Sequence, residues 1–465
     1  MSVEELSINL EWAGTFHIAD HMKKSIQIEL DKQYQFPMDL EVKILDGKYL
    51  VISPNTGNWI VLDNGNQFAF FQYLLKYSVS ESIHLFEGNR RDCEKVLVQI
   101  EGKQFDKNVI NFSVDEKPSL HFYLTNVCNL LCPHCYMNAG APLENELDTN
   151  EVFKILDDFS QYGGCSVTFT GGEVTTRKDF VDIVHEASKC GLEIKILSNG
   201  TLWRQEMIDS VASMVSSIQF SIDGYDEKSH DAIRGKNSFA RTMKTIDRFV
   251  AKGVQVDVAV TPPYDDKLCD RIKEYSDFAL SLTNKYEGEK FVIRFSSELL
   301  DGRNVTLNDN QRKEYKQIID KIYCAYYNED VSDYPFIARF REKRVLENCM
   351  FGNLSISSNG NVYLCSRIPS VSPIGNVRNM PFEEIMFMAH KARDLSNINN
   401  LRPCNKCELK YICGGGCRID YFPSLALCND ICSLDSDSIS ERLCWPSTKD
   451  EFYKMMIRTN DKIIL

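Results

Sequence analysis

The sequence predicts an α/β protein with a central parallel sheet, a small N-terminal module and a cysteine-rich C-terminal region. Three observations support this fold class. Residues 118–330 repeat a short apolar strand and then a helix, whereas residues 36–108 place three strands before three helices. Residues 345–446 hold more than half of the 17 cysteines, among glycines and prolines. Strand–helix repeats build parallel sheets with right-handed crossovers.

Composition narrows the class of protein before any motif is considered. The net charge is −13, and an acidic surface argues against a nucleic-acid partner, which needs basic patches. No run of about 18 apolar residues predicts a membrane span. The N-terminus has no basic stretch before an apolar core, so we expect a cytoplasmic protein. In a reducing compartment, 17 cysteines indicate metal ligands or redox chemistry before disulfides.

The N-terminal region predicts a small winged-helix-like module over residues 36–110, after an unassigned segment 1–35. Its expected strands and helices, separated by the turn signals DG and NTGN, cover residues 40–45, 49–53 and 58–63, then 68–77, 80–86 and 90–102. Grouped strands and helices of this length are typical of a separate small unit rather than of the strand–helix repeat that follows.

The central region, residues 118–330, predicts six parallel strands. They are expected at 119–126, 166–170, 193–198, 217–223, 254–260 and 291–296. Six such units form either an open sheet or a partial barrel. In both arrangements the active site lies at the carboxyl ends of the strands. Arg294 and Glu298 come on or after the sixth strand, so they either face a substrate or form an ion pair at the strand end.

Three cysteines follow the first strand of this region with the spacing Cys128-x3-Cys132-x2-Cys135. Three thiolates this close can ligate three irons of one cube-shaped cluster, which leaves the fourth iron open to a small molecule. A structural zinc site or a redox thiol pair is the alternative. Zinc needs a fourth nearby ligand, and His134 is poorly placed to supply it.

The C-terminal region, residues 331–465, predicts a small metal-stapled domain that ends in a helix near 449–457. An Asn-Gly pair at 359–360 suits a tight turn between two strands. Its ordered cysteines are Cys349, Cys365, Cys404, Cys407, Cys413 and Cys417, followed by Cys428, Cys432 or Cys444. A loop-rich region of this size depends on metal binding for stability.

The Cys128–Cys135 spacing resembles the signature of the radical S-adenosylmethionine (SAM) superfamily, and the resemblance covers about residues 118–446. It implies a partial (β/α)6 barrel and a [4Fe–4S] cluster that cleaves SAM to a 5′-deoxyadenosyl radical. Further motifs match at the ends of strands. The resemblance implies SAM contacts from Gly171, Gly172 and Glu173, from Ser198 and Asn199, from Ser221 and Asp223, from Arg234 toward the methionine carboxylate, and from His134 and Tyr136 near the adenine.

The C-terminal cysteine array resembles the SPASM extension of the same superfamily, which holds two auxiliary [4Fe–4S] clusters. The resemblance assigns Cys349, Cys365 and Cys417 to one cluster. It assigns Cys404, Cys407, Cys413 and a late cysteine, which we expect to be Cys444, to the other. Three [4Fe–4S] clusters that have one open iron among them need about 11 thiolates. The two cysteine motifs together supply one thiolate fewer than this. Either Cys428 or Cys432 fills the gap, or an auxiliary iron is open to substrate. A pair of zinc sites is the alternative.

The N-terminal module resembles the precursor-recognition element of enzymes that mature ribosomally made (RiPP) peptides. The resemblance implies that the leader of a precursor peptide adds as a strand to residues 58–63 and docks against the helix at 90–102. The implied activity is hydrogen abstraction from that peptide, followed by a cysteine thioether or carbon–carbon crosslink. An electron donor such as flavodoxin or ferredoxin is implied as a second partner.

Two other functions fit the same motifs. A sulfatase-maturase-like enzyme would oxidise a cysteine or serine to formylglycine, but that group carries an aspartate after the second SPASM cysteine, where this chain has Ser366. A non-catalytic electron carrier or peptide-binding scaffold is the other alternative. The intact Gly-Gly-Glu motif and the open iron argue against it.

Overall fold

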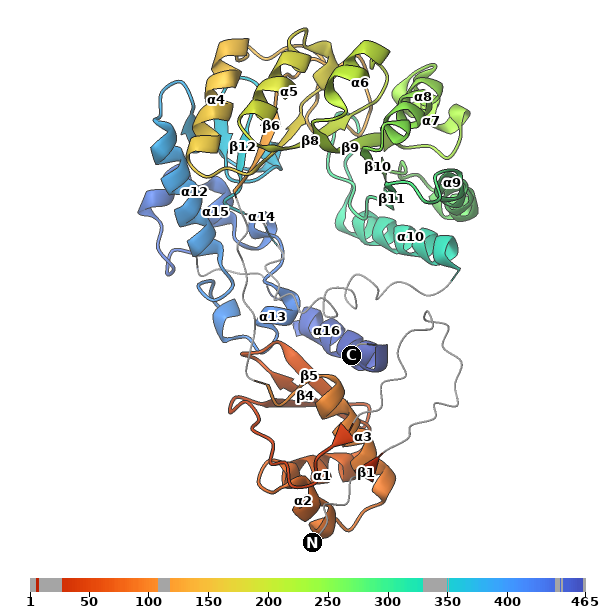
Figure 1. Ribbon diagram of the computed structural model, residues 1–465, viewed down its shortest axis with the longest axis vertical. Coiled ribbons are helices and arrows are strands. Elements are labelled where there is room, and N and C mark those ends of the chain that lie inside the picture. Colours follow the sequence, from red (N-terminus) through yellow and green to blue (C-terminus); the bar gives the residue numbers. More distant parts are fainter. Residues whose placement is uncertain are drawn as a thin grey trace.

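The computed structural model describes residues 6–7, 27–107, 118–328, 349, 351–439, 444 and 446–462. They form three parts that follow one another along the chain (Figure 1): a module of strands and helices at the N-terminus, an arc of strands lined with helices, and a loop-rich C-terminal region. The predicted domain boundaries near 110 and 330 fall outside the described residues.

The N-terminal module contains a three-stranded antiparallel sheet of order β3-β4-β5, after the short paired strands β1 (Leu6–Ser7) and β2 (Gln27–Ile28). Its strands are β3 (Glu41–Leu45), β4 (Lys48–Ser53) and β5 (Asn58–Leu62). Helices α1 (Gly65–Leu74), α2 (Val79–Leu85) and α3 (Arg90–Gly102) follow. A side-chain N-cap begins each helix, since Asn64, Ser78 and Asn89 each accept from a backbone N–H of the first turn.

Both faces of this sheet are buried, which explains why β4 and β5 read as apolar runs rather than alternating patterns. One face packs on α1 and α3 through Val51, Ile60 and Leu62. The opposite face packs on the C-terminal region, in a cluster formed by Leu50, Ile52, Trp59, Val61, Leu409, Ile412, Tyr453 and Met456. The module is therefore docked on the region that carries the late cysteines.

The central region forms six parallel strands in the order β11-β10-β9-β8-β7-β6, as predicted. They are β6 (Ser119–Tyr123), β7 (Ser166–Thr170), β8 (Glu193–Ser198), β9 (Val215–Ile222), β10 (Gln255–Val260) and β11 (Phe291–Phe295). The helices between them are α4 (Thr149–Gln161), α5 (Phe180–Lys189), α6 (Gln205–Val211), α7 (Glu227–Arg234), α8 (Ser238–Ala251) and α9 (Ile272–Lys285), and α10 (Asp309–Tyr327) follows β11. Figure 1 shows α4, α5 and α6 along the outer side of the curved sheet.

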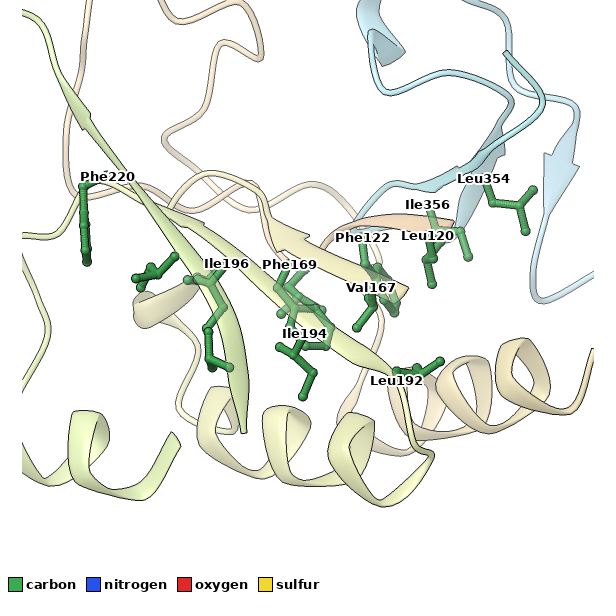
Figure 2. Packing of buried hydrophobic residues seen from close by; sticks show 14 of the residues in the cluster. Leu120, Phe122, Val167, Phe169, Leu192, Ile194, Ile196, Phe220, Leu354 and Ile356 are labelled. Carbon is green, nitrogen blue, oxygen red and sulfur yellow. The ribbon is translucent and has the colours of Figure 1, made fainter. Parts of the chain in front are cut away.

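The core lies between this sheet and its helices. Alternate strand residues point to it, and Figure 2 shows Phe122, Phe169, Ile196 and Phe220 directed from successive strands toward the helices. Alternation with period two leaves the other residues of each strand on the concave face. Arg294 of β11 lies there, 2.8 Å from the Asp257 carboxylate of β10, whereas Glu298 pairs with Arg367, so the strand-end ion pair between Arg294 and Glu298 is not the one that forms.

The sheet continues into the C-terminal region, which the sequence did not predict. Strand β12 (Leu354–Ile356) pairs in parallel with β6, and β13 (Asn361–Tyr363) and β14 (Gly375–Asn376) extend the sheet to nine strands. The predicted turn is confirmed, with Gly360 at φ +86°. The later helices are α12 (Phe382–Ser396), α13 (Lys410–Cys413), α14 (Arg418–Tyr421), α15 (Pro423–Leu427) and α16 (Pro446–Thr459).

Most strand and helix bounds agree with the predicted ranges. Helix α1 is an exception, because it begins and ends about one turn before the predicted range 68–77. Asn64 caps it, and a polar N-cap fixes a helix start more firmly than the apolar residues that follow. In the described part of the chain, no helix has the length and apolar character needed to cross a bilayer.

Candidate active site and cluster ligands

The first three cysteines lie on a loop at the carboxyl end of β6. The loop is closed at its base, where Cys128 N donates to Gly140 O (3.1 Å) and Gly140 N donates to Asn126 O (2.8 Å). Leu130 N lies 3.4 Å from the Cys128 sulfur, and Ala139 N lies 3.4 Å from the Cys135 sulfur. Backbone N–H groups directed at sulfur are typical of cluster thiolates and tune their reduction potential, so this donor set fits an iron–sulfur cluster.

The three thiols of this loop lie close enough together to affect one another's pKa. Burial raises the pKa of Cys128 to about 11, and Cys132 and Cys135 add to the shift. Iron binding deprotonates such thiols and offsets this cost. Among the described residues, no group of three or more His, Cys, Asp or Glu side chains is arranged to hold a single metal ion.

The Gly-Gly-Glu segment packs directly on this loop, and its two glycines are required by sterics. A Cβ on Gly171, which has φ +149°, would lie 2.3 Å from Thr125 O, and one on Gly172 would lie 2.2 Å from Val127 O. Gly172 N donates to Thr125 O (2.7 Å), and Glu173 N donates to Val127 O (2.8 Å). These two backbone N–H groups therefore fix the cysteine loop.

Glu173 is 1% exposed and accepts hydrogen bonds from the end of β8. Its carboxylate accepts from Ser198 Oγ at 2.8 Å and from Asn199 N at 2.7 Å. Burial raises the pKa of this carboxyl, although the hydrogen bonds oppose the shift. Asn199 in turn donates to Asn129 Oδ1 (3.0 Å) in the cysteine loop. The structure thus brings these predicted site residues together.

Arg234 pairs with Asp223 through two nitrogens, and not with Asp231, which is three residues before it in the sequence. His134 Nε2 lies 3.2 Å from the same Asp223 carboxylate, which is fully buried. Burial alone would raise the pKa of Asp223, but the charge of Arg234 and the hydrogen bonds hold it well below its usual range. Asp223 therefore joins the cysteine loop to α7. Ser221 lies on β9, two residues before it.

A third segment holds the cysteine loop and was missed in the sequence. Arg303 N donates to Cys135 O (3.1 Å), and Asn304 N donates to Pro133 O (2.7 Å). The Arg303 guanidinium donates to the carbonyls of Cys132 and Ala139. A Cβ on Gly302 would lie 2.5 Å from the backbone of His134. Only the Asp-Gly turn signal at 301–302 marks this segment in the sequence.

The C-terminal cysteines separate into two groups. Burial raises the pKa of Cys365 to about 11, and Cys349 and Cys417 lie close enough to add to the shift. Arg367 Nη1 lies 3.5 Å from the Cys417 sulfur, and its backbone N lies 3.5 Å from the Cys365 sulfur. Arg367 also reaches Glu298 at 3.7 Å, which connects this group with the loop after β11.

The second group surrounds a small cavity of about 10 Å³ beside α16. Cys404, Cys407, Cys413 and Cys444 line it, together with Lys449 and Phe452 of the helix. The Cys407 sulfur accepts from Leu409 N at 3.4 Å. The other two late cysteines are placed differently, since Cys428 donates to Asp430 O and Cys432 is exposed.

The open parallel sheet, the cysteine loop at the end of β6 and the packed Gly-Gly-Glu segment define a class of iron–sulfur enzymes that use SAM. Residues 122–275 match the Radical SAM superfamily, and residues 348–408 match SPASM, an iron–sulfur cluster-binding domain. The chain belongs to the radical SAM superfamily. These domains indicate [4Fe–4S] clusters and SAM as cofactors.

Several characterised proteins are similar to parts of the chain. The AdoMet-dependent heme synthase of Nitratidesulfovibrio vulgaris is 30% identical over 63% of this chain and 85% of that protein. The sporulation killing factor maturation protein SkfB of Bacillus subtilis is 36% identical over 30% of this chain, but the match spans only 34% of SkfB. The subtilosin biosynthesis protein AlbA of Bacillus subtilis is 26% identical over 69% of this chain and 72% of AlbA.

A solved structure has the same fold. The structure of anSMEcpe with bound AdoMet covers 74% of this chain and 99% of its own, with a TM-score of 0.53 and 17% identity. At that identity the similarity concerns the fold alone. It agrees with the predicted α/β class and the parallel sheet.

Proposed function

We propose that this protein is a radical SAM peptide maturase. It takes a hydrogen from a ribosomally made precursor peptide through a 5′-deoxyadenosyl radical and forms an intramolecular crosslink, either a cysteine thioether or a carbon–carbon bond. The observation that carries the proposal is the N-terminal module. Its strand β5 ends the β3-β4-β5 sheet beside α3, and the same sheet packs on the cysteine-rich region. The names of SkfB and AlbA, which refer to the maturation of a sporulation killing factor and the biosynthesis of the antilisterial bacteriocin subtilosin, support the proposal.

The proposed cluster ligands follow the three groups of thiols. Cys128, Cys132 and Cys135 would hold the SAM-binding cluster; Cys349, Cys365 and Cys417 an inner auxiliary cluster; and Cys404, Cys407, Cys413 and Cys444 an outer one. Around the first group, Glu173 and its partners would bind the amino end of SAM. Arg234 uses Nε and Nη2 for Asp223, which leaves Nη1 for the methionine carboxylate. A reduced flavodoxin or ferredoxin would supply the electron.

The leader of the peptide would bind between β5 and α3. Asn58 of β5 donates to Lys103 O just after α3 (2.8 Å), and Lys95 of α3 pairs with Asp63 just after β5 (2.8 Å), so the strand and the helix lie side by side. A peptide strand gains affinity from backbone hydrogen bonds to a sheet edge and specificity from side-chain pockets. The helix supplies the second wall of such a site.

Leader dependence tests the proposal. The reconstituted full chain is incubated anaerobically with SAM, dithionite and a short peptide encoded beside its gene, either intact or without its leader. We expect a product lighter by two hydrogens from the intact peptide alone, with a leader of scrambled sequence as control. Equal modification of the leaderless peptide would show that the N-terminal module does not recognise the leader. An unchanged mass of the intact peptide would exclude crosslinking.

A tetrapyrrole substrate is the second candidate, because the heme synthase of Nitratidesulfovibrio vulgaris is matched over most of its length. The same assay with a heme precursor in place of the peptide separates the two candidates. A change in the tetrapyrrole mass, with none in the peptide, would favour the second.

A further inference from the structure

Two tyrosines connect the first cysteine loop with the inner auxiliary cysteines. Tyr123 ends strand β6 and is 2% exposed, whereas Tyr136 directly follows Cys135 and is 38% exposed. Their hydroxyl oxygens lie 3.3 Å apart. The Tyr123 hydroxyl also donates to the carbonyl of Ser366 at 2.5 Å, and Ser366 directly follows Cys365. These contacts join two segments that are about 240 residues apart in the sequence.

The direction of each hydrogen bond follows from the number of hydrogens available. A phenol has one hydrogen to donate. Tyr123 gives its hydrogen to the Ser366 carbonyl, which can only accept, so Tyr136 must donate to the Tyr123 oxygen. The result is an unbroken series of covalent and hydrogen bonds from Cys135 through Tyr136, Tyr123 and Ser366 to Cys365.

We propose that this tyrosine bridge, Tyr123 and Tyr136, is the path by which an electron passes between the SAM-binding cluster and the inner auxiliary cluster. The proposal rests on the cluster ligands and the activity proposed above. One cluster loses one electron and the other gains it, while both phenols keep their hydrogens and are not themselves oxidised. Burial raises the pKa of Tyr123, which is consistent with a phenol that stays neutral.

The proposed activity releases an electron that such a path would carry. Forming a thioether removes one hydrogen atom from a C–H bond, one proton from a thiol and one electron. The hydrogen atom goes to the 5′-deoxyadenosyl radical, the proton to solvent, and the electron to the inner auxiliary cluster. Passing that electron across the tyrosine bridge would restore the reduced SAM-binding cluster without a new electron from the donor protein. A carbon–carbon crosslink, which releases the same proton and electron, has the same need.

Electron exchange between the clusters can be measured without peptide turnover. The reconstituted full chain, with all clusters oxidised, receives less than one electron per molecule from a light pulse with deazaflavin. Freeze-quench EPR then follows the redistribution of that electron between clusters. The variants are Tyr123→Phe, which removes both hydrogen bonds, and Tyr136→Phe, which removes one. Tyr286→Phe is the matched control, since its buried hydroxyl bonds Asp247 away from the cysteines. Iron content and the midpoint potential of each cluster are measured for every variant.

We expect fast exchange in the wild type and in Tyr286→Phe, and loss of the fast phase in Tyr123→Phe and Tyr136→Phe with unchanged iron content and potentials. Exchange at the wild-type rate in Tyr123→Phe would overturn the tyrosine bridge and leave the proposed activity intact. A shift in the auxiliary potential that accounts for the slower rate would assign Tyr123 a structural role instead, which also overturns the bridge. Iron for only one cluster in the wild type would overturn the proposed ligands together with the bridge.

Discussion

At the scale of single residues, the site is built by close backbone approach and by one buried carboxylate. Gly171 and Gly172 allow the Gly-Gly-Glu segment to reach the carbonyls of Thr125 and Val127. Asp223 then joins His134 of the cysteine loop to Arg234 of α7. These two features hold different parts of the loop, so substitution at either should release the cluster before it unfolds the barrel.

Gly172→Ala tests the close approach. The added Cβ would lie 2.2 Å from Val127 O, and backbone at this position cannot move as a flexible side chain can. We expect a cost of about 1–3 kcal/mol in the free energy of unfolding, the usual range for overpacking, and loss of the SAM-binding cluster's iron and EPR signal. Gly65→Ala, where a Cβ meets only Tyr49 Oη at 3.6 Å, is the control. Full iron content in Gly172→Ala would contradict this role.

Asp223→Asn tests the buried carboxylate. Removing one partner of a buried ion pair leaves Arg234 unneutralised, which costs about 3–5 kcal/mol of unfolding free energy. We also expect weaker SAM binding, measured by isothermal titration, because Arg234 loses its orientation. Asp301→Asn breaks the exposed pair with Arg312 and serves as control. Equal SAM affinity in both variants would show that Asp223 does not position Arg234.

At the scale of elements, helix α16 connects two functional parts. Its first half lines the outer cysteine cavity through Lys449 and Phe452. Its second half contacts the N-terminal sheet, where Trp59 Nε1 donates to Met456 O at 3.2 Å. Figure 1 shows α16 between the C-terminal region and β4–β5. The sequence predicted this helix but not its partners, because an apolar face specifies burial and not the surface that buries it.

Lys449→Gln tests the first half of this helix. The Lys449 ammonium lies 3.0 Å from Glu408 and close to the Cys407 thiol, with which it interacts. A positive charge beside a cluster thiolate favours the reduced state, which carries more negative charge. We therefore expect a lower midpoint potential for the outer auxiliary cluster in an EPR-monitored redox titration. Lys454→Gln, an exposed position on the same helix, should leave the potential unchanged.

Much of the architecture could be predicted from the sequence, because short apolar strands and polar N-caps act locally. The strands β6–β11, helix α3 and the turn at Gly360 lie close to their predicted ranges. Contacts made by backbone groups across long separations could not be predicted. The segment at Gly302–Asn304 and the Tyr123–Ser366 contact are of this kind. The Arg234–Asp223 pair was not predicted either, because Asp231 is nearer to Arg234 in the sequence, whereas Asp223 is nearer in space.

At the scale of the whole molecule, the docking of the N-terminal module is sensitive to one buried lysine. Lys103 is 6% exposed, its ammonium lies 4.5 Å from the centre of the Trp59 ring, and it donates to Asn460 Oδ1 at 2.5 Å. Burial lowers the pKa of Lys103 to about 7, and Asp461 opposes the shift. Above neutral pH, Lys103 is therefore mainly uncharged in the native protein.

This shift predicts a pH dependence of stability. The unfolded chain keeps the Lys103 proton up to about pH 10.5, whereas the native chain loses it near pH 7. Between these values the unfolded state binds the extra proton, so stability rises with pH, by at most about 1.4 kcal/mol per pH unit. Anaerobic thermal melts should show this rise in the wild type and in the exposed-site control Lys107→Met. Parallel profiles for the wild type and Lys103→Met would exclude Lys103 as the cause.

The central claim is that the radical takes its hydrogen from a peptide held by this chain. The most direct measurement uses a precursor peptide deuterated in its core and isolates the 5′-deoxyadenosine formed after anaerobic incubation with SAM and dithionite. We predict deuterium in the 5′-deoxyadenosine and a crosslinked peptide, with neither in a Cys128→Ala variant. 5′-Deoxyadenosine that forms with the peptide present but carries no deuterium would contradict the account.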